Sequence, residues 1–233
     1  MKPLWGSARA MRLPLVALGH LPHARQIFSG AWTVPSESEA NNIRCAIDLN
    51  YGSMMNMKEQ EFMAQQMQKS YGANRNSAKP LDLYFSGVRL AKEFHPTTVH
   101  PHHESWECKF VDLPAFEAWQ RDELIMLSPD AKHPLLYLDP TKVYVIAGLI
   151  DRSVIKNCSL TRAQQAGVPA LRLPLREFAQ VSNVHPIMDL VTMVKILCEK
   201  NSGASWAESF ALHIPERHIS RRRKEAAQRA KQS

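Results

Sequence analysis

Hydrophobic and polar positions along the chain alternate between two kinds of segment from residue 43 onward. Short apolar runs bounded by Gly, Pro, Asn or Asp predict buried strands at 43–51, 81–88, 107–111, 123–130, 143–150 and 168–175. Segments with helical spacing or helix start and stop signals predict helices at 56–72, 114–122, 159–167, 188–200 and 205–218. Strands separated by helices of this length predict an α/β protein with a mostly parallel sheet that is flanked by helices.

The formal charge of +7 is concentrated at the two ends of the chain. Residues 1–36 carry a net +4 with no acidic residue, residues 216–233 carry +5, and the remainder sums to −2. The acid-free, arginine-bearing composition of 1–36 predicts a mitochondrial transit peptide, with a disordered leader as the alternative. We expect the folded domain at 37–218. A basic tail at 219–233 either contacts phosphates or is a solvated end.

Cysteines and histidines do not form a recognisable metal or disulfide pattern. The four cysteines are far apart with no C-x-x-C pair, which is typical of free thiols in a reducing compartment. A loop contains His95, His100, His102 and His103 with Glu104 and Cys108 nearby, but it lacks the paired spacing of a zinc site, so no metal is predicted. No run of eighteen apolar residues occurs, and no membrane span is expected.

Asp151 is the most suggestive single residue of the pattern. It follows the apolar run 143–150, so we expect it at the carboxyl end of a strand, where open α/β sheets bind ligands. Gly148, three residues earlier, leaves room for a ligand to approach the strand backbone. From the pattern alone, a turn or helix cap after the strand explains Asp151 equally well.

Three segments of the chain follow one another in a specific order and spacing. They are "AIDLNYGSMMNMKEQEFMAQQMQKSYGANRNSAKPLDLYFSG", "LIMLSPDAKHPLLYLDPTKVYVIAGLIDRS" and "SLTRAQQAGVPALRLPLREF". Together they resemble the SPOUT-class tRNA purine-9 N1-methyltransferases, over roughly residues 43–218. The resemblance implies a SPOUT methyltransferase fold with a C-terminal trefoil knot and S-adenosylmethionine as cofactor. Ala147 stands where many members have the first of two glycines.

The resemblance also implies roles for individual residues. Asp151 is the implied catalytic residue, either as the base that removes the proton from N1 of guanine or as a group that orients the purine. The implied cofactor-binding residues are Leu127, Ser128, Gly148, Arg152, Ser153, Lys156, Leu160, Leu173, Met188, Asp189 and Val191. The implied tRNA-binding residues are Gln66, Lys69, Asn74 and Arg75, with exposed helix side chains as the alternative explanation.

The function implied is methylation of N1 of guanosine, and of adenosine as an open alternative, at position 9 of tRNA. The stretch "MDLVTMVKILCEKNSGASWAESFALHIPERH" is similar to the mitochondrial branch of the family, and the leader points to the same compartment. That branch implies a monomeric methyltransferase subunit of mitochondrial ribonuclease P, with a short-chain dehydrogenase and a metallonuclease as partners. The alternatives are a cytosolic or nuclear enzyme and a scaffold that presents tRNA with weak or lost catalysis.

Overall fold

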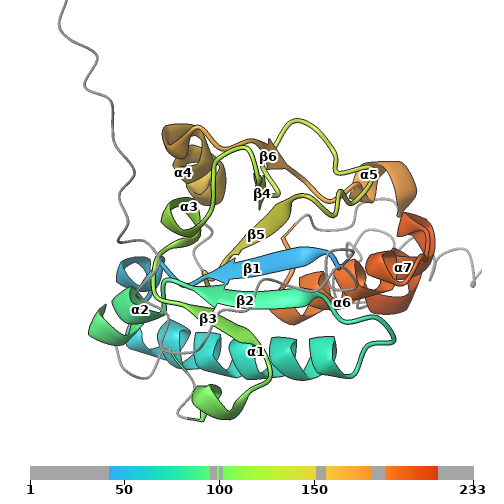
Figure 1. The fold of residues 1–233 in the computed structure, drawn as a ribbon. Helices are drawn as coiled ribbons and strands as arrows, with labels where there is room; N and C mark the ends of the chain where they lie inside the picture. Colours follow the sequence, from blue (N-terminus) through green and yellow to red (C-terminus); the bar gives the residue numbers. More distant parts are fainter. Residues whose placement is uncertain (1–41, 95–98, 100–101, 151–155, 180–186, 215–233) are drawn as a thin grey trace, which may run out of the picture. The chain divides into compact units, whose positions relative to one another are not determined.

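Six parallel strands form one sheet in the part of the chain that the computed structural model describes, residues 42–94, 99, 102–150, 156–179 and 187–214. The strands are β1 (Arg44–Asp48), β2 (Asp82–Ser86), β3 (Lys109–Val111), β4 (Leu124–Leu127), β5 (Val143–Ala147) and β6 (Ala170–Leu171). Their order in the sheet is β3-β2-β1-β5-β4-β6, and every pair is parallel (Figure 1). The predicted α/β class with a parallel sheet is therefore confirmed.

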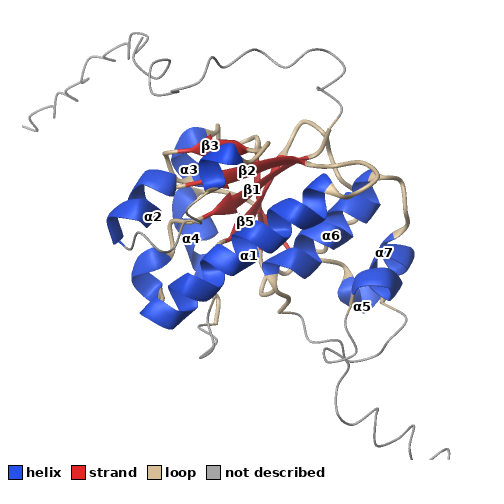
Figure 2. Cartoon of the chain, turned by 90° about the horizontal axis from the view of Figure 1, so that it is seen from below, coloured by secondary structure: helices blue, strands red, loops and turns tan. Residues whose placement is uncertain are grey.

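Helices cover both faces of this sheet (Figures 1 and 2). The face with the larger core carries α1 (Met57–Arg75), α6 (Leu190–Asn201) and α7 (Trp206–His213). The opposite face carries α3 (Ala115–Ala118) and α4 (Cys158–Ala166). The remaining helices are α2 (Val88–Phe94), α5 (Leu175–Phe178) and the short 3₁₀ turns η1 (Gly52–Met54) and η3 (His103–Ser105).

Alternation of side chains along β1 and β5 divides the apolar interior into two clusters. Tyr144 and Ile146 point to the cluster under α1 and α6, whereas Val143 and Val145 point to the cluster under α3 and α4. Because both faces of these strands are buried, they read as continuous apolar runs in the sequence. This pattern is the reason that β1 and β5 could be predicted.

Helix α1 begins with a capping box and extends further than its sequence pattern indicated. The Asn56 side chain accepts a hydrogen bond from Glu59 N, and the Glu59 side chain accepts one from Asn56 N. The predicted end at Gly72 is wrong, since the helix runs on to Arg75. Gly72 lies in the helix with free space around it, and packing of α1 against α6 outweighs its low helix propensity.

Two other predicted elements differ from the structure, and one helix was not predicted. The strand expected at 168–175 is reduced to β6, because Pro169 and Pro174 have no N–H for a ladder and the chain turns into α5. The helix expected at 114–122 ends after one turn, at Ala118. Helix α2, at 88–94, was not predicted, because Val88 was assigned to the end of the strand 81–88 and no element was assigned to the residues that follow it.

Candidate active site at the carboxyl edge of the sheet

The strand order reverses direction between β1 and β5. From β1 the chain builds outward to β2 and β3, and it then crosses to the other side, where β5, β4 and β6 lie (Figure 1). Open α/β sheets bind ligands outside the carboxyl ends of the strands at such a switch point. The carboxyl ends that meet here carry Asp48 on β1 and its register partner Ala147 on β5.

Asp48 is a carboxylate that the sequence analysis did not single out. Its side chain is almost fully buried, with 2% exposed, and Oδ1 accepts hydrogen bonds from Ser86 Oγ at 3.2 Å, Ala115 N at 3.3 Å and Asn50 N at 3.4 Å. Burial raises the pKa of this carboxyl, and the three donors and the nearby Arg162 offset part of that rise. A buried carboxylate with a raised pKa at a ligand crevice is a candidate functional group.

The signal that could have identified Asp48 was present in the sequence. A short apolar run, Cys45 to Ile47, leads directly into the aspartate, which is a shorter form of the pattern that selected Asp151. What the pattern did not contain was the pairing of β1 with β5, which places both strand ends at one point.

Gly148 has a different reason for being glycine than the one predicted. Its N–H donates to the Asp48 carbonyl oxygen at 2.8 Å. A Cβ added at Gly148 would lie 2.6 Å from that oxygen and 3.1 Å from Leu49 Cδ2. The backbone of β1 lies where that Cβ would be, so close packing of the two strand ends explains the glycine, and contact of Gly148 with a cofactor stays a prediction.

Arg162 of α4 holds the turn after β1. Its guanidinium carbon lies 4.2 Å from the centre of the Tyr51 ring, and Nη1 donates to the Asn50 carbonyl. Burial raises the pKa of the Tyr51 hydroxyl, with the carboxyl of Asp48 as the next largest cause. The start of the β1–α1 connection is therefore fixed by contacts from the opposite face of the sheet.

Polar residues at the end of β4 are bound to the start of α4. Ser159 Oγ donates to the buried Ser128 Oγ at 2.9 Å, and Asn157 N donates to Asp130 Oδ2 at 2.9 Å. The predicted cofactor residues Ser128, Lys156 and Leu160 lie on this α4 side, with Lys156 exposed and Leu160 half-buried.

Apolar members of the predicted cofactor set lie on the other side of the strand ends. Leu127 and Leu173 are nearly buried in the cluster under α6, and Met188, Leu149 and Ile150 pack against it while keeping part of their surface exposed. The carboxyl ends of β4, β5 and β6 therefore carry an apolar lining on one side and a serine and lysine side on the other.

Two predicted cofactor residues on α6 have other contacts. Asp189 is the N-cap of α6, and its Oδ1 accepts a hydrogen bond from Thr192 N at 2.8 Å, a role that explains an aspartate at this position. Val191 lines a groove between α1 and α6, where Lys69 lies on the opposite helix. Asp151, Arg152 and Ser153 lie outside the described residues.

Of the four predicted tRNA-binding residues, two are buried and two are exposed. Gln66 and Asn74 face the interior, with 5% and 7% exposed. The Asn74 side chain donates to the Leu81 carbonyl at 3.0 Å and accepts from Leu81 N at 2.8 Å, so it fastens the start of β2 to α1 and is not available to RNA. Lys69 and Arg75 project from the surface of the same helix.

The described residues contain no group of three His, Cys, Asp or Glu side chains placed to hold a metal ion, and His95 and His100 lie outside them. All four cysteines are free, and burial raises the pKa of the Cys108 thiol to about 12. No helix in the described part of the chain is long and apolar enough to cross a membrane.

The fold defines an α/β protein whose parallel sheet has its switch point between β1 and β5, which is where such sheets bind ligands. The chain belongs to the tRNA (guanine(9)-N(1))-methyltransferase TRM10/TRM10A family, whose model matches residues 23–219. The family is a more specific class of protein than the fold alone defines.

Curated relatives carry names of the same family, and solved Trm10 structures have a similar fold. The chain is 29% identical over 174 residues to tRNA methyltransferase 10 homolog C of Xenopus tropicalis, covering 73% of this chain and 38% of that protein. It is 26% identical over 193 residues to tRNA (guanine(9)-N1)-methyltransferase of Schizosaccharomyces pombe, covering 76% and 59%. The full-length spTrm10–SAH complex has a TM-score of 0.65 at 23% identity, covering 75% of this chain and 94% of that chain. These curated relatives are longer proteins, of which the chain spans between two fifths and three fifths.

Proposed function

We propose that this chain is a tRNA methyltransferase that forms N1-methylguanosine at position 9, with S-adenosylmethionine as the methyl donor. The observation that carries the proposal is the switch point at the carboxyl ends of β1 and β5, in a chain that the family model matches over residues 23–219. The printed name of the Schizosaccharomyces pombe relative states this activity, and spTrm10 was solved with SAH.

The residues at the strand ends suit such a cofactor. Met188, which keeps part of its surface exposed next to the buried Leu127 and Leu173, offers apolar surface for an adenine ring, and backbone N–H and C=O groups at the ends of β4 and β5 can bind its polar edges. When bound, S-adenosylmethionine supplies an electrophilic methyl group for N1 of the purine. Lys156, exposed on the α4 side of these strand ends, is suited to the cofactor carboxylate or an RNA phosphate.

Asp151 is proposed to act on the target base. N1 of guanine carries a proton, which leaves as the N–CH₃ bond forms, and a carboxylate beside it lowers the barrier by accepting that proton or by orienting the ring. Asp48 is proposed to support this function from below the crevice, where it ties the ends of β1 and β2 to α3. Arg152 and Ser153 are proposed to contact the cofactor next to Asp151.

The decisive experiment compares Asp151→Asn with the exposed-surface control Asp112→Asn. We expect Asp151→Asn to reduce methyl transfer to tRNA by at least about tenfold, and by about a hundredfold or more where Asp151 acts as the base, with tRNA binding retained. The control should keep wild-type turnover. Turnover of Asp151→Asn equal to the wild type would remove Asp151 from the mechanism, and no turnover by the wild-type chain would remove the proposed activity.

A SPOUT trefoil knot in the C-terminal part of the domain is part of the proposal. It is supported by the likeness of the fold to Trm10 structures. Activity on adenosine at position 9 is also proposed, because N1 of adenine has no proton to lose and Asp151 could then serve by orientation alone. Transcripts that carry A9 or G9, incubated with labelled S-adenosylmethionine, separate the two specificities.

The mitochondrial matrix is the proposed compartment, supported by the acid-free composition of residues 1–36. In that case the chain is proposed to work as the methyltransferase subunit of mitochondrial ribonuclease P, with a short-chain dehydrogenase and a metallonuclease. Import of the full chain into isolated mitochondria, followed by reconstituted 5′-end cleavage with and without the chain, tests both statements. Full cleavage with the Asp151→Asn variant would favour a tRNA-presenting role, and a cytosolic or nuclear location would contradict the assignment.

A further inference from the structure

A groove of about 560 Å³ lies between α1 and α6, away from the carboxyl ends of the strands. One wall is the last half of α1 and the turn after it, with Lys69, Asn76 and Ser77. The other wall is α6 with the end of α7, where Lys195, Glu199 and His213 contribute. Figure 2 shows α1 and α6 side by side on the outer face of the molecule.

Two lysines give this groove positive charge that the protein itself does not neutralise. Lys69 and Lys195 come from opposite walls, both side chains are exposed, and neither is in an ion pair within the described residues. The acid in the groove, Glu199, is engaged by His213, whose Nε2 lies 3.2 Å from Glu199 Oε1. Some basic side chains elsewhere on the domain are paired with acids, for example Lys109 with Asp82 at 3.0 Å.

The surface between the two lysines is open, which suits an extended phosphate backbone better than a compact ion. Gly72 lies at the groove, and even an added Cβ there would meet nothing within 4 Å, so the helix surface is open at this point. The exposed Asn76 offers amide donors next to it. Lysines act on phosphates as point charges without fixed geometry, and they suit the successive phosphates of a chain.

We propose that the α1–α6 groove binds the phosphodiester backbone of the substrate tRNA, as a contact separate from the methylation crevice and with Lys195 as a previously unassigned RNA-binding residue. This inference rests on the proposed function for the choice of an RNA as the polyanion. Contacts to phosphates position a nucleic acid without reading its bases. The groove therefore holds the body of the tRNA while the crevice acts on the purine.

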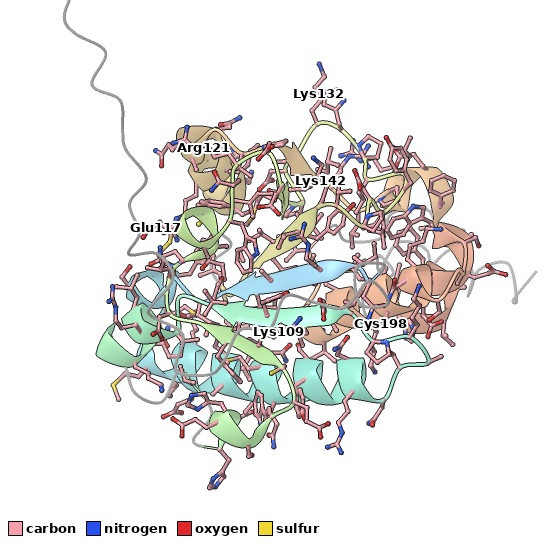
Figure 3. The ribbon with its side chains drawn as sticks, viewed as in Figure 1. Lys109, Glu117, Arg121, Lys132, Lys142 and Cys198 are labelled. Carbon is pink, nitrogen blue, oxygen red and sulfur yellow. The ribbon has the colours of Figure 1, made fainter. Side chains whose placement is uncertain are left out.

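The test is the salt dependence of tRNA binding by the full chain and its Lys195→Ala, Lys69→Ala and double variants. The matched control is Lys132→Ala, an exposed lysine that projects from the molecule far from α1 and α6 in Figure 3. Each groove variant should weaken binding by about two- to fivefold, the range for an exposed ion pair, and lower the slope of log Kobs against log salt by about 1. Lys195→Arg should restore both values, since it keeps the charge.

Turnover separates this inference from the proposed function. With saturating tRNA, the groove variants should keep the wild-type kcat and show a raised KM, and their melting temperature should not change. Wild-type affinity and salt slope in the double variant would overturn the groove as an RNA site, even when the chain methylates tRNA normally. An equal loss in Lys132→Ala would overturn it as well, because the effect would then follow total charge. Absence of methyl transfer by the wild type, with the groove variants still weakened, would contradict only the proposed activity.

Discussion

Replacing Gly148 by alanine tests the close packing of β1 on β5, which defines the candidate site. The new methyl group would lie 2.6 Å from the Asp48 carbonyl oxygen, whereas Cβ atoms essentially never come within 3.0 Å of a neighbour. Relief requires the two strand ends to separate by at least about 0.4 Å, the difference between these distances, and the obstacle is backbone that no rotamer change can move. The same movement stretches the 2.8 Å hydrogen bond from Gly148 N to that oxygen.

The expected cost combines two terms. Overpacking of a tight interior costs about 1–3 kcal/mol, and weakening one buried hydrogen bond adds up to about 1 kcal/mol. We therefore expect Gly148→Ala to lower the free energy of unfolding by about 2–3 kcal/mol and the melting temperature by about 4–12 °C for a domain of this size. Methyl transfer should fall as well, because the strand ends that form the crevice move apart.

Urea unfolding and thermal unfolding of the full chain measure the effect. The matched control is Gly72→Ala, in the interior of α1, where an added Cβ meets nothing within 4 Å. This control should raise the free energy of unfolding by up to about 1 kcal/mol, because alanine has the better helix propensity. Equal stability of Gly148→Ala and the wild type would refute the close-packing argument and would return Gly148 to the role of leaving space for a ligand.

Three further predictions follow from single contacts. Gly167→Ala should lower the free energy of unfolding by about 1 kcal/mol, because Gly167 ends α4 with a φ of +68°, which strains an alanine even though its Cβ would have space. An unchanged midpoint of urea unfolding would contradict this. Asp48→Asn should gain stability relative to the wild type as pH rises from 4 to 8. Burial raises the pKa of Asp48 in the folded state, so the wild type loses stability as pH rises through that pKa; a pH-independent difference would show that the carboxyl is not desolvated. Asn74→Ala should lower the free energy of unfolding by about 1–3 kcal/mol, since both hydrogen bonds to Leu81 are lost in the interior. Unfolding at neutral pH measures this structural role, and tRNA binding by the same variant measures any contact with RNA.

Local sequence determined the elements that depend on near neighbours. The apolar runs of β1 and β5 could be read because both faces of these strands are buried, whereas Asp48, at the end of the β1 run, was not singled out. The same reading placed a ligand site at the carboxyl end of β5, and the structure confirms the parallel sheet on which that expectation rests.

The face of α1 could not be read from its sequence. Its buried side includes Glu59, Gln60, Gln66, Ser70 and Asn74, which differ little in polarity from its exposed residues. Helical periodicity identifies a buried face only where apolar and polar positions contrast, so the pattern of α1 gave no reason against the RNA contacts of Gln66 and Asn74 that the family resemblance implied. Contacts with α6 and Leu81 decide their burial.

Tertiary structure alone decided which strand ends meet. Strands β1 and β5 begin almost a hundred residues apart in the sequence, and no local pattern indicates that β5 lies between β1 and β4 in the sheet. That pairing places Asp48 beside Ala147, packs Gly148 against a carbonyl oxygen and creates the switch point. Side-chain pattern fixes the elements because it is a property of neighbouring residues, whereas strand order depends on long-range pairing and on the helices that cover each face.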